Sequence, residues 1–211
     1  MEILRNIFDL IVNPNEHKNK GSSGERLIYM DLTGAFSNIF DEDQILRNVY
    51  IKKKNGRYTE VDLLAVTTKG IFVIESKNYS GWIFGSEWQK EWTQIFKGGK
   101  RVKFYNPIMQ NDSHIKALMG ELGGYKRIQY QSLIVFSERC EIKSMAIKSP
   151  NISVIKRNDL NKEISQLYKN MRDCITRKEQ IEIVAKLSIL SRPKEEIRKQ
   201  HIEGLHKYSK K

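Results

Sequence analysis

Three charged residues stand within or directly after apolar runs in one short stretch of the chain, RYTEVDLLAVTTKGIFVIESKNY, which covers residues 57–79. Asp62 lies inside the first apolar run, while Glu75 and Lys77 lie at the end of the second. Burying such charges is costly unless they are paired or bind a metal ion. Two carboxylates held close together are able to share one divalent cation, so this stretch predicts a metal site.

The two apolar runs predict an antiparallel hairpin, because the chain between them is long enough only for a tight turn. A Thr68-Lys69 loop places Asp62 opposite Glu75, whereas a Lys69-Gly70 loop, which suits the glycine better, places Asp62 opposite Lys77. In both registers the three charges share one face, since residues two apart on a strand point the same way. Directly opposed β-carbons lie about 5 Å apart, which is close enough for two carboxylates to share one ion.

A structural role is the alternative explanation for these charges. Charged residues often flank a buried strand where it reaches the surface, which would account for Glu75 and Lys77 taken alone. Asp62 is different because it lies within its apolar run, between Val61 and Leu63. An internal ion pair between Asp62 and Lys77 would explain it, but buried ion pairs are a poor source of stability. A functional site is therefore the better explanation.

The elements that must position these charges follow the order helix, three strands, helix, two strands and C-terminal helices. Periodicity and turn residues place them, in chain order, at residues 24–36, 44–51, 58–66, 70–77, 107–122, 132–136, 152–155 and from 158 onward. Asn106 and Pro107 are typical of a helix cap and a first helical residue. This order predicts an α/β fold whose central mixed sheet is covered by helices on both faces.

The same pattern divides the chain into three parts. Residues 1–21 form an N-terminal segment and a polar linker, residues 22–157 form the main domain, and residues 158–211 form a basic helical extension. The last 20 residues carry seven Lys and Arg against three Glu, a net charge of +4. The whole chain of 211 residues carries 37 Lys and Arg against 25 Asp and Glu, a net charge of +12. A polyanionic partner is expected, nucleic acid ahead of an acidic membrane surface, with a merely solvated basic surface as the alternative.

Other classes of protein are disfavoured by what the sequence lacks. No apolar run reaches the roughly 18 residues of a membrane span, so neither membrane insertion nor secretion is expected and a cytoplasmic location is predicted. Cys140 and Cys174 are far apart and match neither a metal-ligand spacing nor a disulfide framework. The sequence does not indicate an oligomeric state.

Three blocks of sequence, in order, carry a family resemblance. They are GERLIYMDL from Gly24, EVDLLAVTTKGIFVIESKNYSGWIFG from Glu60, and NPIMQNDSHIKAL from Asn106. These blocks resemble the motifs of the nuclease-related domain (NERD) family of the PD-(D/E)xK nuclease superfamily, over about residues 24–122. The aspartate is preceded by Val61 where the superfamily name has proline, which is often absent there. The resemblance implies a restriction-endonuclease-like core and a metal-dependent nuclease.

The resemblance also implies roles for the charged residues. Asp62 and Glu75 would be ligands of Mg²⁺ or Mn²⁺, ions that take oxygen donors, with the backbone carbonyl of Ser76 as a third ligand. Lys77 would orient or activate the attacking water and stabilise charge on the phosphate.

Further positions match the family less firmly. Glu25 corresponds to an acid on the first helix of the superfamily, although Ser22 and Glu25 also fit a capping box. Gln110 corresponds to a helix glutamine that follows the catalytic strand in related nucleases. His114 lies one turn further along the same helix face, where it would contact nucleic acid or pack internally.

Several features have both a nucleic-acid-binding and a structural explanation. A basic turn next to the hairpin would hold backbone phosphates or would simply be a solvated turn; it contains Lys52, Lys53, Lys54 and Arg57. Three tryptophans would stack on unpaired bases or would pack inside the fold; they are Trp82, Trp88 and Trp92.

The sequence as a whole predicts a cytoplasmic, magnesium-dependent nuclease that acts on DNA, with RNA not excluded. A non-catalytic nucleic-acid-binding module that retains the nuclease fold is the second hypothesis. The two hypotheses differ in whether Asp62, Glu75 and Lys77 take part in a catalysed reaction.

Overall fold

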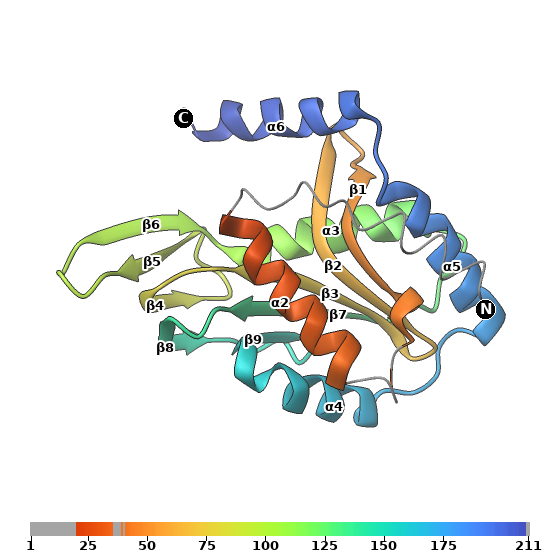
Figure 1. The fold of residues 1–211 in the computed structure, drawn as a ribbon, viewed down its shortest axis with the longest axis horizontal. Helices are drawn as coiled ribbons and strands as arrows, with labels where there is room; N and C mark the ends of the chain where they lie inside the picture. The colour runs from red at the N-terminus through yellow and green to blue at the C-terminus, as the bar shows by residue number, and fades with distance from the viewer. Residues whose placement is uncertain (1–19, 36–38, 40, 210–211) are drawn as a thin grey trace.

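The computed structural model describes residues 20–35, 39 and 41–209 of the chain. Nearly all of the predicted N-terminal segment, residues 1–21, therefore lies outside the described residues. The described chain contains two β-sheets and the helices that flank them (Figure 1). The helices are α2 (Lys20–Ala35), α3 (Pro107–Glu121), α4 (Leu160–Asn170), α5 (Arg177–Leu190) and α6 (Glu195–Ser209).

The larger sheet is mixed, as the sequence predicts, and has the strand order β1-β2-β3-β7-β9. Its strands are β1 (Ile45–Lys52), β2 (Tyr58–Thr67), β3 (Gly70–Lys77), β7 (Tyr130–Phe136) and β9 (Ile152–Lys156). The pairs β1–β2 and β2–β3 are antiparallel, whereas β3–β7 and β7–β9 are parallel. The parallel pair β3–β7 requires a long connection, and the chain between these strands includes α3.

Helices cover both faces of this sheet, which confirms the predicted layer order. On one face, Ile28 and Leu32 of α2 and Leu160 and Ile164 of α4 pack against strand residues such as Phe72. On the other face, α3 and α5 pack against a second set of strand residues; the helix side of this cluster includes Ala117, Leu118, Leu122, Ile183 and Leu187. The C-terminal extension is helical as expected, and its helices α4 and α5 contribute to both cores of the main domain.

The predicted cap of α3 is present. Asn106 accepts a hydrogen bond at 2.9 Å from the backbone amide of Ile108, and Pro107 is the first helical residue. The amide nitrogen of the Asn106 side chain donates to the backbone carbonyls of Ser86, Glu87 and Gln89, so the residue both caps the helix and binds a turn about 20 residues earlier in the chain. The N-terminal turn of α3 is therefore tied to that turn.

The smaller sheet is the part of the fold that the sequence did not predict. It has the order β6-β5-β4-β8. Its strands are β4 (Gly81–Ser86), β5 (Glu91–Ile95), β6 (Arg101–Tyr105) and β8 (Cys140–Ala146). Figure 1 shows β4, β5 and β6 extending to the left of the main sheet.

A third core joins the smaller sheet to the larger one. Trp92 is fully buried and stacks on Phe136 of β7, with ring centroids 6.2 Å apart and ring planes 13° apart. Gly85 leaves room for this indole, because a β-carbon at Gly85 would lie 2.4 Å from the Trp92 ring. Trp92 is thus a packing residue, whereas the side chains of Trp82 and Trp88 are 46% and 56% exposed.

No helix among residues 20–35 and 41–209 combines the length and the apolar character that crossing a membrane requires.

Candidate active site

The hairpin that carries the predicted charges has the register of a Thr68-Lys69 loop. Thr67 pairs with Gly70, and the ladder continues to the pair Leu63–Ile74. The alternative Lys69-Gly70 loop is therefore wrong. Gly70 instead begins β3 with φ +140°, at a point where a β-carbon would lie only 2.4 Å from the carbonyl oxygen of Gln129. The glycine is required by this close backbone contact and not by the turn.

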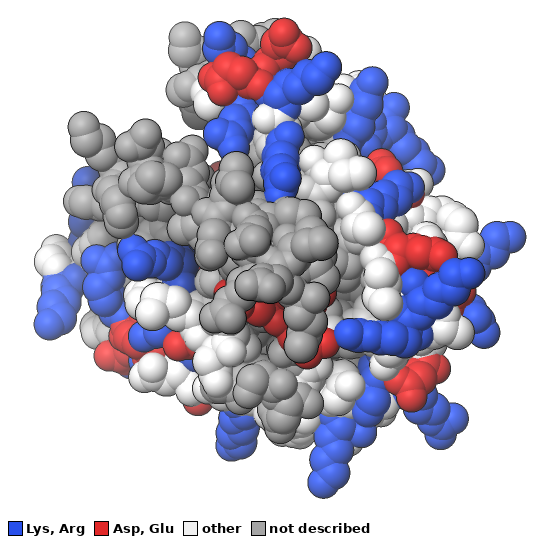
Figure 2. All heavy atoms as spheres, turned by 45° about the vertical axis from the view of Figure 1, so that its right-hand side comes forward, with Lys and Arg blue, Asp and Glu red and all other residues white. Residues whose placement is uncertain are grey.

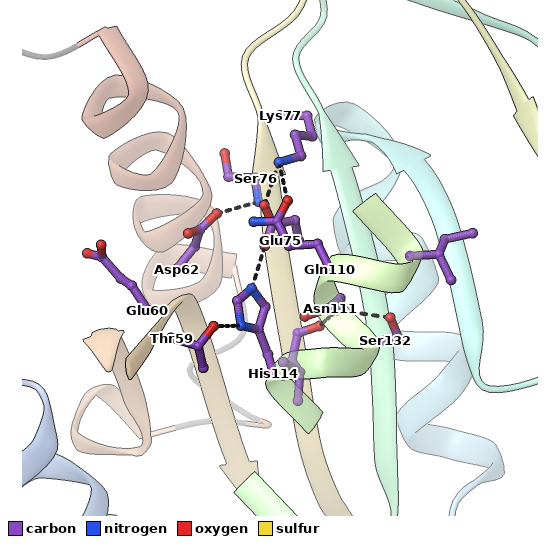
Figure 3. A network of polar contacts seen from close by, with 12 residues as sticks. Thr59, Glu60, Asp62, Glu75, Ser76, Lys77, Gln110, Asn111, His114 and Ser132 are labelled. Carbon is purple, nitrogen blue, oxygen red and sulfur yellow. Dashed lines mark hydrogen bonds and ion pairs between the residues drawn. The ribbon is translucent and has the colours of Figure 1, made fainter. Parts of the chain in front are cut away.

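The ladder of paired residues between β2 and β3 ends at Leu63 and Ile74, so Asp62 and Glu75 would be the next opposed pair. Beyond that point the backbone amide of Ser76 donates to Oδ2 of Asp62 at 2.9 Å, so a side chain takes the place of a strand partner. Asp62 thus lies against the edge of β3, within the network that Figure 3 shows.

A local irregularity in β1 and β2 turns Asp62 toward that edge. Val61 and Leu64 pack in the same core cluster although they are three residues apart, whereas a regular strand would point them to opposite faces. Asn48, which lies opposite Asp62 between the pairs Arg47–Leu63 and Val49–Val61, has φ +52°. Asparagine is one of the few residues that adopts this left-handed conformation at low cost.

Glu75 and Lys77 form the centre of the site. Nζ of Lys77 lies 2.6 Å from Oε1 of Glu75 and donates to Oε1 of Gln110 at 3.0 Å. Glu75 is only 1% exposed. Because Gln110 comes from α3, this contact joins the helix to the strand that carries both charges (Figure 3).

His114 holds the other oxygen of Glu75. Its Nε2 lies 3.2 Å from Oε2 of Glu75, and its Nδ1 lies 2.9 Å from Oγ1 of Thr59. The His114 side chain is buried, with 3% of the residue exposed. Of the two roles that the sequence left open, the internal one matches this position, since both ring nitrogens have partners inside the protein.

Thr59 and Asn111 are two supporting residues that sequence reasoning did not single out. Nδ2 of Asn111 donates to the carbonyl of Val73 at 2.8 Å and to Oγ of Ser132 at 2.9 Å, which ties α3 to β3 and β7. The available signal for Asn111 was its place directly after Gln110 in the third block of family motifs. Thr59 carried no such signal, because its contact with His114 joins residues 55 positions apart.

The surroundings shift the pKa values of the three charged groups in different directions. Burial, the nearby charge of Glu75 and the charge of Glu25 raise the pKa of Asp62 well above its usual range. Burial also tends to raise the pKa of Glu75, but Lys77 and His114 outweigh it and lower that pKa. Burial tends to lower the pKa of Lys77, but Glu75 outweighs it and raises that pKa.

Glu25 lies on α2, close enough for its charge to act on Asp62, in agreement with its predicted place beside the site. The helix begins at Lys20, so Ser22 lies within it and not at the N-cap that a capping box requires. The charges of two acids on other elements, Glu25 and Glu75, therefore both act on Asp62. This repulsion at Asp62 favours a bound cation.

The oxygen donors at the gap between β2 and β3 fit a hard divalent ion. Asp62 and Glu75 offer carboxylates, and the carbonyl of Ser76 points to the same strand edge as its amide, which faces Asp62. A carboxylate has about four acceptor positions, so the contacts of Glu75 with Lys77 and His114 leave room for an ion. Among the described residues, no three side chains of His, Cys, Asp or Glu gather closely enough to ligate an ion alone. A backbone carbonyl or water ligands would complete the set.

The predicted phosphate-binding residues form a separate group beside the site. Lys52, Lys54 and Arg57 are exposed and Lys53 is half-buried, all in or next to the turn from β1 to β2. Helix α6 lies against this end of β2, where Nδ1 of His201 is 3.3 Å from the carbonyl oxygen of Tyr58. The basic turn and the basic C-terminal segment, which are far apart in sequence, thus lie side by side.

Comparison with known proteins identifies related sequences. Residues 20–137 match the nuclease-related domain (NERD) family. An uncharacterized protein from Bacillus anthracis is 32% identical over 98% of this chain and 97% of its own length. The family match contains every residue of the candidate site, from Glu25 to His114.

Proposed function

The chain belongs to the nuclease-related domain family, and from this premise we propose that it is a metal-dependent nuclease that hydrolyses phosphodiester bonds of DNA. The observation that carries the proposal is the convergence of Asp62, Glu75 and Lys77 at the point where β2 and β3 separate. A buried acid with a raised pKa beside an acid with a lowered pKa is typical of a site built for chemistry.

Asp62, Glu75 and the Ser76 carbonyl would hold a Mg²⁺ or Mn²⁺ ion. Such an ion supplies a more acidic water molecule and neutralises charge on the scissile phosphate. The raised pKa of Asp62 supports this assignment, because burial and neighbouring acids make its carboxylate unfavourable without a compensating positive charge.

Lys77 acts in this proposal as a fixed positive charge. Its raised pKa keeps the amine protonated near neutral pH, so it is poorly suited to accept a proton from water. The contacts with Glu75 and Gln110 hold the ammonium group in place, where it would stabilise negative charge that develops on the phosphate. Gln110 is thus a positioning residue for Lys77.

His114 and Thr59 position Glu75 in the same way. The chain of contacts Thr59–His114–Glu75 fixes the orientation of the carboxylate from the side opposite Lys77. Carboxylates that bind metal ions are commonly oriented by such outer contacts, and loss of one typically lowers metal affinity or activity about 10- to 100-fold.

DNA is the proposed substrate because the chain carries a net charge of +12 and because a basic turn precedes β2, the strand that carries Asp62. Figure 2 shows Lys and Arg side chains standing out over much of one described face, with Asp and Glu scattered among them. This distribution suits contact with a phosphate backbone in many registers.

The test is an assay of the full chain on labelled linear and circular DNA, single- and double-stranded, and on RNA. Each substrate is incubated with Mg²⁺, Mn²⁺ or EDTA, beside a Glu75→Gln variant purified in the same way. Cleavage that needs the metal and is lost in the variant supports the proposal. Binding of nucleic acid without cleavage under every condition would favour the non-catalytic module.

A further inference from the structure

Two tryptophans of the smaller sheet and its turns are exposed to solvent. Trp82 is the second residue of β4 and Trp88 lies in the turn from β4 to β5; the two residues are 46% and 56% exposed. Ile83, the next residue after Trp82, is fully buried in the third core, so Trp82 points away from the protein. Tryptophan is enriched at binding surfaces, because its ring supplies a large apolar area.

A lysine accompanies each of these tryptophans. Nζ of Lys143 lies 5.4 Å from the ring centre of Trp82, and Nζ of Lys148 lies 5.5 Å from that of Trp88. Each pair places a flat apolar ring next to a positive charge, which is the combination that binds a base together with its phosphate. Two such pairs occur at opposite ends of one strand of six residues.

Strand pairing continues this pattern across the sheet, because directly opposed residues share a face. One row runs from Trp82 through Ile95 to Arg101, and the next runs from Phe84 through Thr93 to Lys103. Each row has an aromatic ring on β4 and a cation on β6. Acids accompany these cations: Glu91 pairs with Lys103 at 3.6 Å, and Glu141, which lies opposite Trp82 on β8, pairs with Lys143. Glu87 accepts a hydrogen bond from the backbone amide of Lys148.

A groove lies on this face beside the turn that carries Trp88. It has a volume of about 540 Å³, and its walls include Phe84, Thr93 and Lys103 on the sheet, Gln89 and Lys90 in the turn, and the acid Glu91. Gln89 directly follows Trp88, and Phe84 lies two residues after Trp82 on the same strand. The two lysines of the groove suit a phosphate chain, and the ring of Phe84 suits an unpaired base.

The place of this sheet in the chain brings it next to the candidate active site. Its strands β4, β5 and β6 are inserted between two elements that carry the site, since β3 ends at Lys77 before β4 and α3 begins at Pro107 after β6. Trp82 is five residues beyond Lys77, which limits their separation along the chain to about 18 Å.

We propose that this outer face binds single-stranded nucleic acid and leads it to the active site. Trp82 and Trp88 stack on unpaired bases, and the phosphates are bound by the surrounding cations, Lys90, Arg101, Lys103, Lys143 and Lys148. Duplex DNA does not use the two rings, because its bases are already stacked. The proposal rests on the proposed nuclease function for its choice of partner, and it narrows that function to substrates with single-stranded segments.

The test measures binding of the full chain, in EDTA, to a labelled oligothymidylate of about 20 nucleotides and to a duplex of equal length. Trp82→Leu and Trp88→Leu should each weaken binding of the single strand about 10-fold, because leucine keeps an apolar group but not a stacking ring. Trp82→Phe and Trp88→Phe should retain most of the affinity. Duplex binding should change less than 2-fold, in line with a phosphate-dominated interaction.

Ile189→Ala is the matched control, since Ile189 on α5 is also a large exposed apolar residue, 73% exposed. Equal binding of the single strand by the parent and both leucine variants would overturn the proposal, as would an equal loss for single strand and duplex. Cleavage with Mg²⁺ is measured separately. If the parent cleaves DNA with the metal and the leucine variants bind the single strand as well as the parent, the proposed binding surface is refuted and the nuclease function is not. If the leucine variants lose single-strand binding selectively and the parent never cleaves, the nuclease function is refuted and the binding surface is not.

Discussion

At the scale of single residues, the two carboxylates of the candidate site differ in what surrounds them. Asp62 lies near two other acids, Glu25 and Glu75, and it accepts a hydrogen bond from the neutral backbone amide of Ser76. Glu75 lies between Lys77 and His114, each within hydrogen-bonding distance. The same chemical group is therefore disfavoured in its ionised form at one position and favoured at the other.

Asp62→Asn should stabilise the metal-free protein at neutral pH. The raised pKa of Asp62 means that ionising this carboxyl costs more free energy in the folded protein than in the unfolded chain. This loss of stability is absent below the pKa of the unfolded chain and grows as pH rises toward the pKa of the folded protein. Asparagine keeps an oxygen for the Ser76 amide and carries no charge. We expect the Tm in EDTA to rise by roughly 2–4 °C, the shift that about 1 kcal/mol produces in a domain of this size. The gain over the parent should shrink as pH falls toward about 4, where the unfolded aspartate protonates; a gain that is unchanged by pH would contradict the assignment.

Glu75→Gln should have the opposite effect. The lowered pKa of Glu75 contributes stability above its unfolded pKa, and this contribution is lost as pH falls through the folded pKa. Glutamine leaves the buried Lys77 without its partner, which typically costs about 3 kcal/mol. Denaturant unfolding in EDTA at neutral pH measures the loss, and the difference from the parent should narrow in acid. Equal stability of parent and variant would mean that Lys77 and Glu75 are not paired in solution.

Lys77→Ala should separate metal binding from chemistry. Removing the ammonium group frees Oε1 of Glu75, so metal affinity should persist or increase, while cleavage should fall by about 10²-fold as charge stabilisation is lost. Asp62→Ala and Glu75→Ala should lower both cleavage and metal affinity. Calorimetric titration with Mn²⁺ and single-turnover cleavage rates distinguish these outcomes. Lys116→Ala, which removes an exposed lysine of α3, is the control and should match the parent in both measurements.

At the scale of elements, the smaller sheet depends on one close contact. Gly85 of β4 faces the Trp92 ring, which packs on Phe136 of the main sheet. Gly85→Ala should destabilise the protein by about 1–3 kcal/mol, because the added methyl group forces the indole out of its packed position. Gly120→Ala is the matched control: Gly120 lies in α3 with open space around its β-carbon position, and alanine there should stabilise the helix by up to about 1 kcal/mol. Urea unfolding of both variants tests the pair, and a neutral Gly85→Ala would argue against this packing.

The sequence predicted the main sheet well because its strands are long apolar runs. β1, β2, β3, β7 and β9 all lie within one or two residues of the predicted bounds. The smaller sheet was missed for a physical reason: β5 and β6 are five residues each, and β6 has four exposed residues out of five. Short strands with a polar outer face have no strong alternation, and β5 and β6 become strands through their pairing with each other and with β4.

The candidate site was predictable in its residue types but not in its geometry. Asp62, Glu75, Lys77 and Gln110 could be chosen because the family motifs contain them, and a regular hairpin explained why three charges meet. The structure brings them together differently, through the early end of the β2–β3 ladder and the left-handed Asn48. Such an irregularity depends on how three strands pack together, so no pattern within one strand reveals it.

At the scale of the whole molecule, the turn between β1 and β2 and the helix α6 join two basic segments into one surface. His201 of α6 contacts the carbonyl of Tyr58 and lies 3.6 Å from a carboxylate oxygen of Glu60, while its ring meets Tyr50 edge-on. Deleting residues 192–211 would therefore remove a net charge of +4 and also disturb the strand that carries Asp62. Changing exposed charges alone is the cleaner way to test this surface.

Neutralising the basic turn with Lys52→Gln, Lys54→Gln and Arg57→Gln together should weaken binding of duplex DNA and reduce its dependence on salt. All three side chains are exposed and lie outside the candidate active site, so fold and metal site should be retained. Each phosphate contact releases counterions and adds about 0.9 to the steepness of a plot of log binding constant against log salt concentration. Losing three contacts should therefore reduce this steepness by up to about 2.7. The control replaces Lys162, Lys169 and Arg172 with glutamine, which removes the same number of exposed charges on the α4 side of the molecule. Binding is measured in EDTA between about 50 and 200 mM salt. A smaller slope for the turn variant alone would locate the DNA contact beside β1, β2 and α6, whereas equal slopes for both variants would show that the +12 charge acts as a diffuse field without a preferred face.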